Sequence, residues 1–257
     1  MSTLILEEIN FLDYELLKKT TTARHSLANN VFMKNKLYKK LIIFGNAEQA
    51  ELAYFYFSKF SDHDISAFTI DSDFISEDSF CGLSVVPFDK VEQIYPPSEY
   101  SLFIALGYSK INALRKEKFL AAKSRGYQLS TYISKNATIL NEGAIGENCF
   151  ILEDNTIQPF VKIGNNVTLW SGNHIGHHSV IQDHTFIASH VVVSGGVEIG
   201  EQCFIGVNAT LRDHIKIGSR CVLGAGSLIL NDVEDEGVYI GKSTERSRVP
   251  SSRLRGI

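Results

Sequence analysis

The chain has 257 residues, of which 44% are hydrophobic, so it can bury one large core or two modest ones. Its formal net charge of -4 gives no electrostatic reason to expect a nucleic-acid ligand. We therefore expect a folded protein that binds no nucleic acid.

Residues 1–38 are predicted to form an N-terminal extension with one amphipathic helix, from Ile5 to Lys19, that packs against the domain after it. Its first ten residues include acids and lack a basic segment before an apolar run, which argues against a secretory signal. The sequence has no long uncharged apolar run, which argues against a membrane span. We expect a cytoplasmic protein.

Residues 39–132 are predicted to form an α/β domain with a short, Rossmann-like parallel sheet, because apolar strands alternate with helical patterns. The expected elements are a strand at 40–44, a helix at 48–59, a strand at 65–70, a strand at 102–106 and a helix at 110–124. Ligands of such sheets bind beyond the carboxyl ends of the strands. The residues that fall there are Gly45, Asn46, Ala47, Asp71, Asp73 and Gly107.

A nucleotide suits this position. The turn at Gly45 contains only part of a dinucleotide fingerprint, because the second and third glycines are absent. A phosphate-binding turn and a plain strand-to-helix turn therefore remain equally open for Gly45.

From residue 133 the chain repeats every six residues. Stepping by six from Ile133 to Ile229 meets an aliphatic residue each time. A helix of about 3.6 residues per turn cannot keep every sixth residue on one face, whereas a triangular coil with six-residue sides can. Residues 133–257 are therefore predicted to form a parallel β-helix with a C-terminal tail. Three of the four cysteines occupy small-residue positions of the repeat, and we expect reduced core thiols at Cys149, Cys203 and Cys221.

Six of the eight histidines lie in the coils: His174, His177, His178, His184, His190 and His214. Zinc is one reading, but the β-helix carbonic anhydrases use two histidines five residues apart, and no such pair occurs here. General-base catalysis is the other, because imidazole can take a proton from a sugar amine or hydroxyl that attacks a thioester. Gly195 and Gly196, one coil beyond His177, offer a backbone N–H for the oxyanion.

The segments 174–181 and 193–200 resemble the hexapeptide-repeat sugar acetyltransferases, such as the bacillosamine N-acetyltransferases and the sialic-acid-type O-acetyltransferases. The α/β domain is similar to theirs as well. The resemblance implies a left-handed β-helix and a homotrimer, and the spacing of the histidines disfavours a metal site. It also implies acetyl-CoA as co-substrate and a nucleotide-linked amino sugar as acceptor, in the synthesis of a bacterial surface glycan.

The resemblance also implies roles for particular residues. His177 becomes the base, with His178 beside it and Gly195 near both the oxyanion and coenzyme A. Gly45, Asn46 and Ala47 are expected to bind the phosphates of the sugar nucleotide, and Asp71 and Asp73 are expected to bind its base or ribose. The groove for coenzyme A, between two subunits, is assigned to Gly206, Val207, Asn208, Gly224 and Ala225.

Two of the departures from the family lie in the coils. His178 stands where an Asp or Glu usually follows the base, so carboxylate support for the base is either absent or comes from elsewhere, such as Glu153, Asp154 or Asp183. Phe186 replaces a second histidine that often lies nine residues later. N-acetylation of a nucleotide-linked amino sugar is the main hypothesis, and sugar O-acetylation and a non-catalytic trimeric scaffold are the alternatives.

Overall fold

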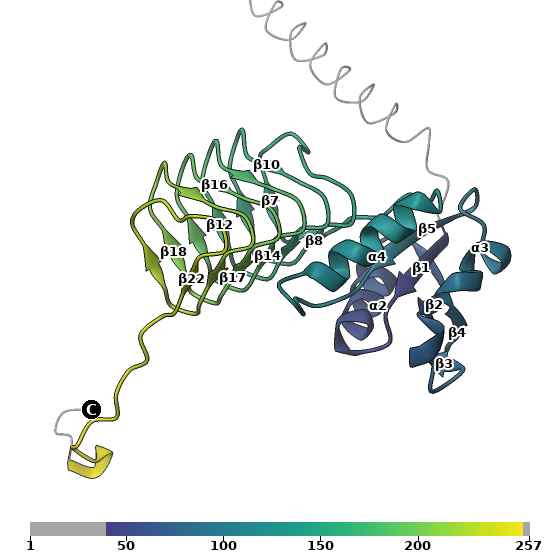
Figure 1. Ribbon diagram of the computed structural model, residues 1–257, viewed down its shortest axis with the longest axis horizontal. Coiled ribbons are helices and arrows are strands. Elements are labelled where there is room, and N and C mark those ends of the chain that lie inside the picture. The colour runs from purple at the N-terminus through teal and green to yellow at the C-terminus, as the bar shows by residue number, and fades with distance from the viewer. Residues whose placement is uncertain (1–39, 254–257) are drawn as a thin grey trace, which may run out of the picture. The chain divides into compact units, whose positions relative to one another are not determined.

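The computed structural model describes residues 40–253, so the helix expected from Ile5 to Lys19 lies outside the described residues. Within them, an α/β unit is followed by a stack of coils (Figure 1).

The α/β unit is built on a five-stranded sheet of order β3-β4-β2-β1-β5. Strands β1, β2, β4 and β5 run parallel, and β3 pairs antiparallel with β4. The strands are β1 (Lys40–Phe44), β2 (Asp64–Ile70), β3 (Ser79–Phe80), β4 (Leu83–Pro87) and β5 (Tyr100–Ile104). The predicted parallel sheet is confirmed, and β3 and β4 extend it beyond the three strands expected.

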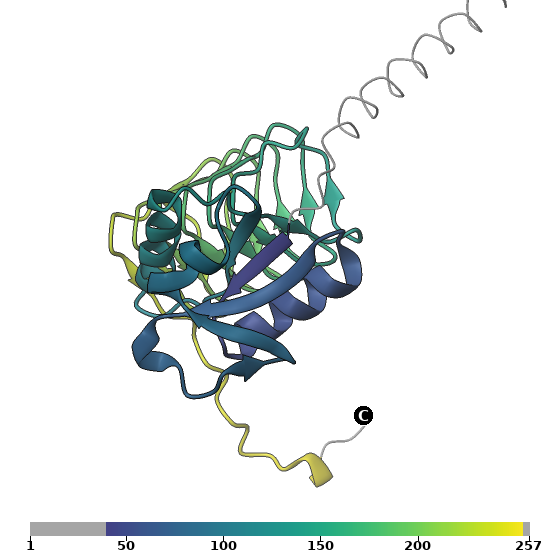
Figure 2. The same cartoon turned by 90° about the vertical axis from the view of Figure 1, so that its right-hand side faces the viewer.

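Two helices, α2 (Glu48–Phe60) and α4 (Ala113–Ser124), cover opposite faces of this sheet (Figure 2). Successive strand residues point to opposite faces, so Leu41 packs with Phe57 of α2 and Ile42 packs with Phe119 of α4. The shorter helices are η1 (Ser72–Phe74), η2 (Phe88–Lys90), α3 (Val91–Ile94) and η3 (Ser251–Arg253).

Helix α4 begins three residues later than the sequence pattern predicted. Lys110, Ile111 and Asn112 have φ angles of 52°, 50° and 62°, so the chain runs through a left-handed turn before the helix. A β-branched residue such as Ile111 rarely adopts this conformation. The loop after β5 therefore holds backbone strain at the edge of the sheet where ligands are expected.

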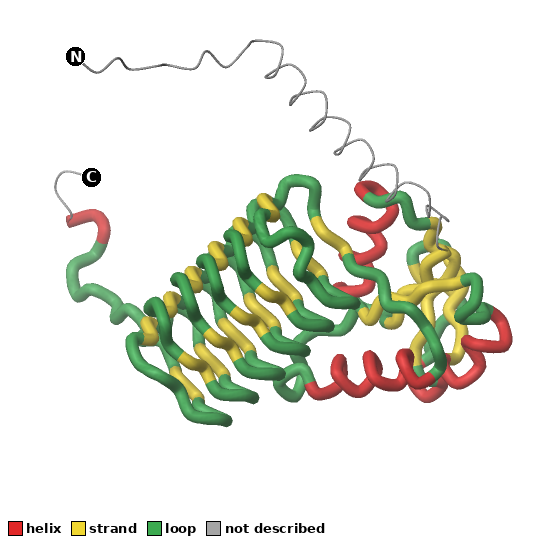
Figure 3. The backbone as a smooth tube through the Cα atoms, turned by 90° about the horizontal axis from the view of Figure 1, so that it is seen from above, coloured by secondary structure: helices red, strands yellow, loops and turns green. Residues whose placement is uncertain are grey.

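The coils form three parallel sheets whose two-residue strands line up along the β-helix (Figure 3). The seven-stranded sheet contains β6 (Tyr132–Ile133), β8 (Phe150–Ile151), β11 (Thr168–Leu169), β14 (Phe186–Ile187), β17 (Phe204–Ile205), β20 (Val222–Leu223) and β22 (Val238–Tyr239). The six-stranded sheet contains β7 (Thr138–Ile139), β9 (Thr156–Ile157), β12 (His174–Ile175), β15 (Val192–Val193), β18 (Thr210–Leu211) and β21 (Leu228–Ile229). The four-stranded sheet contains β10 (Lys162–Ile163), β13 (Val180–Ile181), β16 (Glu198–Ile199) and β19 (Lys216–Ile217). The predicted repeat is confirmed.

The aliphatic residues of the repeat fill the inside of the coils. From Ile151 to Ile229 they are at most 4% exposed. Ile133 is 37% exposed, contrary to the expectation that every repeat aliphatic lies inside, because the first coil has a neighbour on one side only. Cys149, Cys203 and Cys221 are buried free thiols, and burial raises the pKa of Cys149 and Cys203 to about 12. These thiols therefore serve packing, as predicted.

The coils turn at three columns of corner residues, nearly all in the left-handed region. Corner A, between the seven- and six-stranded sheets, has Asp154, Gly172, His190, Asn208 and Gly226. Corner B, between the six- and four-stranded sheets, has Glu142, Phe160, His178, Gly196 and His214. Corner C, between the four- and seven-stranded sheets, has Asn148, Asn166, His184, Gln202 and Arg220.

Corner C joins the coils to the edge of the α/β sheet. The side-chain amide of Asn148 accepts from Ile104 N at 2.7 Å and donates to Ile104 O at 3.3 Å, so it satisfies the open edge of β5. Asn148 also donates to Asn166 Oδ1 at 2.8 Å, and Asn166 Nδ2 lies 2.9 Å from His184 Nδ1. Asn and His tolerate positive φ better than most residues, which suits them to this ladder.

Acid is expected to destabilise the protein through His184. Burial, the largest cause, and the nearby cation Lys116 lower the pKa of His184 to about 4. Between pH 6.5 and 4 the unfolded chain binds a proton that the folded chain does not. The free energy of unfolding therefore decreases as the pH is lowered, by about 3 kcal/mol over this window. The charged groups around His184 are Lys116, Asp183, Arg115 and Glu201.

Urea unfolding between pH 4 and 7.5 measures this effect. His184→Asn, which keeps a neutral side chain at a positive-φ position, should flatten the dependence, whereas His214→Asn, at an exposed corner, should leave it unchanged. Equal slopes in wild type and His184→Asn would refute the assignment.

Candidate active site

Corner B carries an exposed pair of histidines. His177 Nδ1 lies 3.1 Å from His178 Nδ1, and the two rings are nearly perpendicular at 86°. The backbone N–H of His177 donates to Gln158 Oε1 at 2.8 Å, which ties this corner to the coil before it. Both side chains are exposed, so the pair is open to a ligand.

The His177 ring lies against the coil that follows it. A Cβ added to Gly195 would fall 2.7 Å from His177 Nε2, so a side chain at position 195 would displace the imidazole from this place. Within residues 40–253 the Gly195 N–H has no hydrogen-bond partner. The predicted neighbourhood of His177, His178 and Gly195 is therefore present, and it places an exposed imidazole beside a backbone N–H that has no partner within residues 40–253.

The residues expected to hold a nucleotide lie at the carboxyl ends of β1, β2 and β5. Gly45 has a φ of 133°, and a Cβ there would fall 2.9 Å from Ala105 O, so β1 and the chain after β5 approach too closely for a side chain. Helix α2 follows with Ala47 as its N-cap and no side-chain cap. Ala50 N donates to Ala47 O at 2.8 Å, which leaves the amides of Glu48 and Gln49 for another acceptor, as at phosphate-binding helix starts.

Asp71 is paired within the chain. Its carboxylate lies 2.8 Å from Lys118 Nζ, and the Lys118 ammonium stands 5.9 Å from the centre of the Phe44 ring. Asp73 is exposed in η1, and Gly107 follows β5. Lys118 therefore places a cation at this edge. The sequence did not predict this role, because it depends on how α4 packs against the sheet.

Arg115 fastens α4 to the seven-stranded sheet. Its guanidinium, in a residue only 2% exposed, donates to Thr168 Oγ1 and to the carbonyls of His184 at 3.2 Å and Thr185 at 3.3 Å. It also stands 5.6 Å from the centre of the Phe186 ring. This contact explains why position 186 is apolar: Phe186 is buried beneath the α/β unit.

The residues assigned to coenzyme A lie at corner A in two consecutive coils. Gly226 N donates to Val207 O at 2.8 Å, so the Gly224–Ala225–Gly226 turn stacks directly on Gly206–Val207–Asn208. A Cβ on Gly206 would fall 2.6 Å from Ala225 N, which gives this glycine a packing role in any case. Val207 is 41% exposed and open to a ligand.

The structure gathers the expected residues into three groups and does not unite them in one chain. The α/β unit contacts the seven-stranded sheet, through Arg115 with Thr168 and through Tyr108 with Phe186 and Phe204. Corner B lies between the other two sheets of the triangular coil. His177 is therefore across the β-helix from the edge that is expected to bind a nucleotide in its own chain.

The carboxylates expected to support His177 lie at other corners. Glu153 accepts from Tyr56 at 3.0 Å and from Ser171 at 2.8 Å, and Asp154 is beside it at corner A. Asp183 accepts from the backbone of Asn165 at 2.7 Å next to corner C. The expectation that one of them supports the base is therefore wrong for a single chain.

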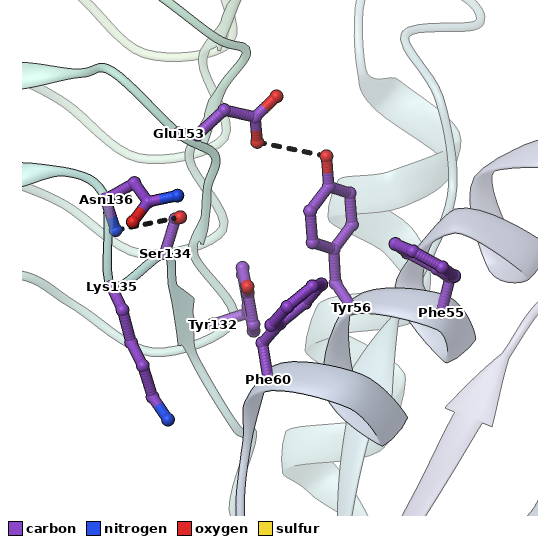
Figure 4. Close-up of a pocket in the computed structure, with 8 residues that line it drawn as sticks. All are labelled: Phe55, Tyr56, Phe60, Tyr132, Ser134, Lys135, Asn136 and Glu153. Atoms are coloured by element: carbon purple, nitrogen blue, oxygen red, sulfur yellow. Dashed lines mark hydrogen bonds between the residues drawn. The ribbon is translucent and has the colours of Figure 1, made fainter.

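A cavity of about 360 Å³ opens between α2 and the first coils. Figure 4 shows Phe55, Tyr56 and Phe60 of α2 across from Ser134, Lys135 and Asn136, with the Tyr56–Glu153 hydrogen bond at its rim. It was not expected from the sequence, because its walls come from segments far apart in the chain. It lies by the C-terminal end of α2, away from the Gly45 turn.

No group of three or more metal-ligating side chains occurs among residues 40–253. In the same part of the chain, no helix is both long and apolar enough to cross a bilayer.

Residues 143–177, 160–195 and 196–231 match the family described as bacterial transferase hexapeptide (six repeats). A solved histidine-to-asparagine variant of the perosamine N-acetyltransferase from Caulobacter crescentus, in complex with CoA and GDP-perosamine, is similar at 23% identity and a TM-score of 0.71, over 79% of this chain and 93% of that chain. WeeI from Acinetobacter baumannii AYE is similar at 21% identity and a TM-score of 0.65, over 79% and 97% of the two chains. The acetyltransferase domain of PglB from Neisseria gonorrhoeae FA1090 is similar at 20% identity and a TM-score of 0.53, also over 79% and 97%.

No curated protein sequence matches the chain. The structural likeness confirms the predicted fold, an α/β unit followed by a left-handed parallel β-helix.

Proposed function

We propose that this chain, whose coils match the bacterial transferase hexapeptide family, is an acetyl-CoA-dependent N-acetyltransferase of a nucleotide-linked amino sugar. The observation that carries the proposal is the exposed His177 ring packed against Gly195, whose N–H is free within residues 40–253. The perosamine N-acetyltransferase structures support it, because they hold CoA and GDP-perosamine and two of them carry substitutions of one histidine.

In the proposed reaction the sugar amine attacks the thioester carbonyl carbon and a C–N bond forms. The Gly195 N–H donates to the oxyanion of the tetrahedral intermediate, and His177 Nε2 takes the amine proton. The C–S bond then breaks, and the proton passes from His177 to the leaving thiolate. The products are an N-acetylated sugar nucleotide and free coenzyme A.

A complete site requires more than one copy of the chain. A sugar nucleotide held at Gly45, Asn46 and Ala47 lies on the side of the seven-stranded sheet, across the β-helix from His177 of the same chain. We therefore propose a homotrimer in which His177 of one copy meets the α/β unit of the next. Coenzyme A would lie in the groove between copies, along Gly206 and Gly224 at corner A.

The nucleotide edge would use the groups that the structure places there. The uncapped start of α2 offers backbone N–H groups to the phosphates, and Lys118 offers a cation beside Asp71. We place the reaction in the cytoplasm and assign residues 39–132 to the sugar nucleotide and residues 133–257 to acetyl transfer.

Incubation of the purified chain with acetyl-CoA and a panel of GDP- and UDP-linked 4-amino sugars tests the proposal. The expected result is sugar-dependent release of free thiol, together with a mass increase of one acetyl group on the sugar nucleotide. The matched control is the same nucleotide linked to the 4-hydroxy sugar, which should give no release.

Each other outcome has a distinct meaning. Acetylation of the hydroxy sugar alone would establish O-acetylation and overturn the amine assignment. Failure of acetyl-CoA to bind, measured by calorimetry, would leave the coils as a scaffold and overturn the enzyme assignment.

A further inference from the structure

The partner of His177 at corner B is a second imidazole. We propose that His178 is a positioning residue that accepts a hydrogen bond from His177 Nδ1 and so directs the Nε2 lone pair of His177 toward the sugar amine. This inference rests on the proposed function, in which His177 is the base.

The geometry permits one proton between the two rings. At 3.1 Å the two Nδ1 atoms are within hydrogen-bonding distance, and one must donate while the other accepts. When His177 takes a proton at Nε2, both of its nitrogens become donors, so His178 Nδ1 must then be the acceptor. The bond becomes charge-assisted as the proton arrives, so it stabilises the transition state more than the resting enzyme.

The surrounding coils hold both rings in place. The Phe160 ring lies one coil before His178, with centroids 4.7 Å apart and an interplanar angle of 39°. Phe160 is 66% exposed and has a φ of 66°, an uncommon combination for a bulky residue. His177 is held on its other side by the close approach of Gly195. The pair is thus restrained on both sides before any ligand binds.

The neighbours of the pair carry no charge of their own. In the coils directly before and after, corner B presents Pro159, Phe160, Gly195 and Gly196. The next ionisable corner groups in these columns are Glu142, Asp213 and His214, which are two coils away, roughly 10 Å at the usual strand spacing. His174 lies on the strand before the corner.

An imidazole acceptor differs from a carboxylate in its effect on pH dependence. A carboxylate would favour protonated His177 and leave less free base in mildly acidic solution. A neutral imidazole stabilises the protonated form of His177 less than a carboxylate does. The enzyme should therefore retain activity at lower pH than a variant with a carboxylate at position 178. This difference separates a positioning role from a purely structural one.

Three substitutions that tolerate the φ of 61° at position 178 test the inference: His178→Gly, His178→Asn and His178→Asp. His178→Gly should lower kcat about 10- to 100-fold, the usual effect of removing a supporting hydrogen bond, with both KM values within about twofold. His178→Asn, which keeps an acceptor oxygen, should recover part of the loss. His178→Asp should recover activity at alkaline pH and move the acidic limb of the pH–rate profile to higher pH.

A measurement without turnover separates this inference from the proposed function. In the full chain labelled with ¹⁵N-histidine, the His177 resonances should report a proton on Nδ1, and His178→Gly should change them. His214→Gly, at an exposed corner with a φ of 56°, is the matched control and should leave them unchanged.

An Nε2-protonated His177 that is unaffected by His178→Gly would overturn the inference. An unchanged kcat and pH–rate profile in His178→Gly would also overturn it. If no sugar is acetylated by the wild type, the proposed function fails, and the resonances still decide whether His178 orients His177.

Discussion

Replacement of His177 by alanine is expected to lower kcat for sugar acetylation by about 10²- to 10⁴-fold, the usual contribution of a general base. The sugar amine must lose a proton as its bond to the acetyl carbon forms, and we propose that the His177 ring takes it, beside the Gly195 N–H that has no partner within residues 40–253. The side chain is exposed, so its removal should leave the melting temperature unchanged.

Initial rates of thiol release at saturating acetyl-CoA measure this effect, with the sugar nucleotide varied. His214→Ala, two coils further along the same corner, is the control and should keep wild-type rates. An increase in KM at constant kcat would instead make His177 a binding residue, and the proposed mechanism would be wrong.

Replacement of Arg115 by alanine is expected to lower the free energy of unfolding by about 3 to 5 kcal/mol. The guanidinium is buried and bonded to Thr168, Asn112 and the carbonyls of His184 and Thr185. Burial lowers the pKa of Arg115 to about 10, so the group still carries its charge at neutral pH. The substitution leaves a cavity and removes the donor to the His184 carbonyl.

Urea unfolding at pH 7.5 measures the loss. Lys116→Ala is the matched control, because Lys116 pairs with Glu201 on the surface at 3.2 Å and should contribute less than about 1 kcal/mol. Arg115→Met keeps much of the volume without the charge and should cost less than alanine. Equal losses for Arg115→Ala and Lys116→Ala would show that the buried network does not hold the two parts together.

The coils could be predicted from the sequence because the six-residue period of the aliphatic residues determines the geometry of the coil. An aliphatic residue at every sixth position has one packing solution, and the small residues two positions earlier, such as Cys149 and Cys203, are buried as that solution requires. Strand β3 was missed because it is two residues long, and β4 was missed because it ends in Pro87, a residue that argues against a strand in a sequence. The start of α4 was misplaced because a strained turn overrides the apolar pattern at Lys110 to Asn112.

The candidate site was predictable where it follows the coil period and unpredictable where it depends on packing between segments. The proximity of His177 to Gly195 follows from the 18-residue coil, and the structure shows it. The pairing of Asp71 with Lys118 and the burial of Phe186 beneath Arg115 depend on how α4 lies, which no local pattern states. The candidate carboxylates Glu153, Asp154 and Asp183 lie at other corners than His177, because sequence distance alone does not assign a residue to a corner.

Each coil from β8 to β20 takes 18 residues, and this period restricts which insertions and deletions the β-helix can accept. Loss or gain of six residues would leave the aliphatic pattern intact, and the coils would still pack. The same change would rotate every later residue to the next corner and separate His177 from the coil positions before it. Only an insertion or deletion of a whole 18-residue coil preserves both the buried core and the columns of corner residues. Related proteins should therefore differ in their number of coils more often than in the corner at which a given residue lies.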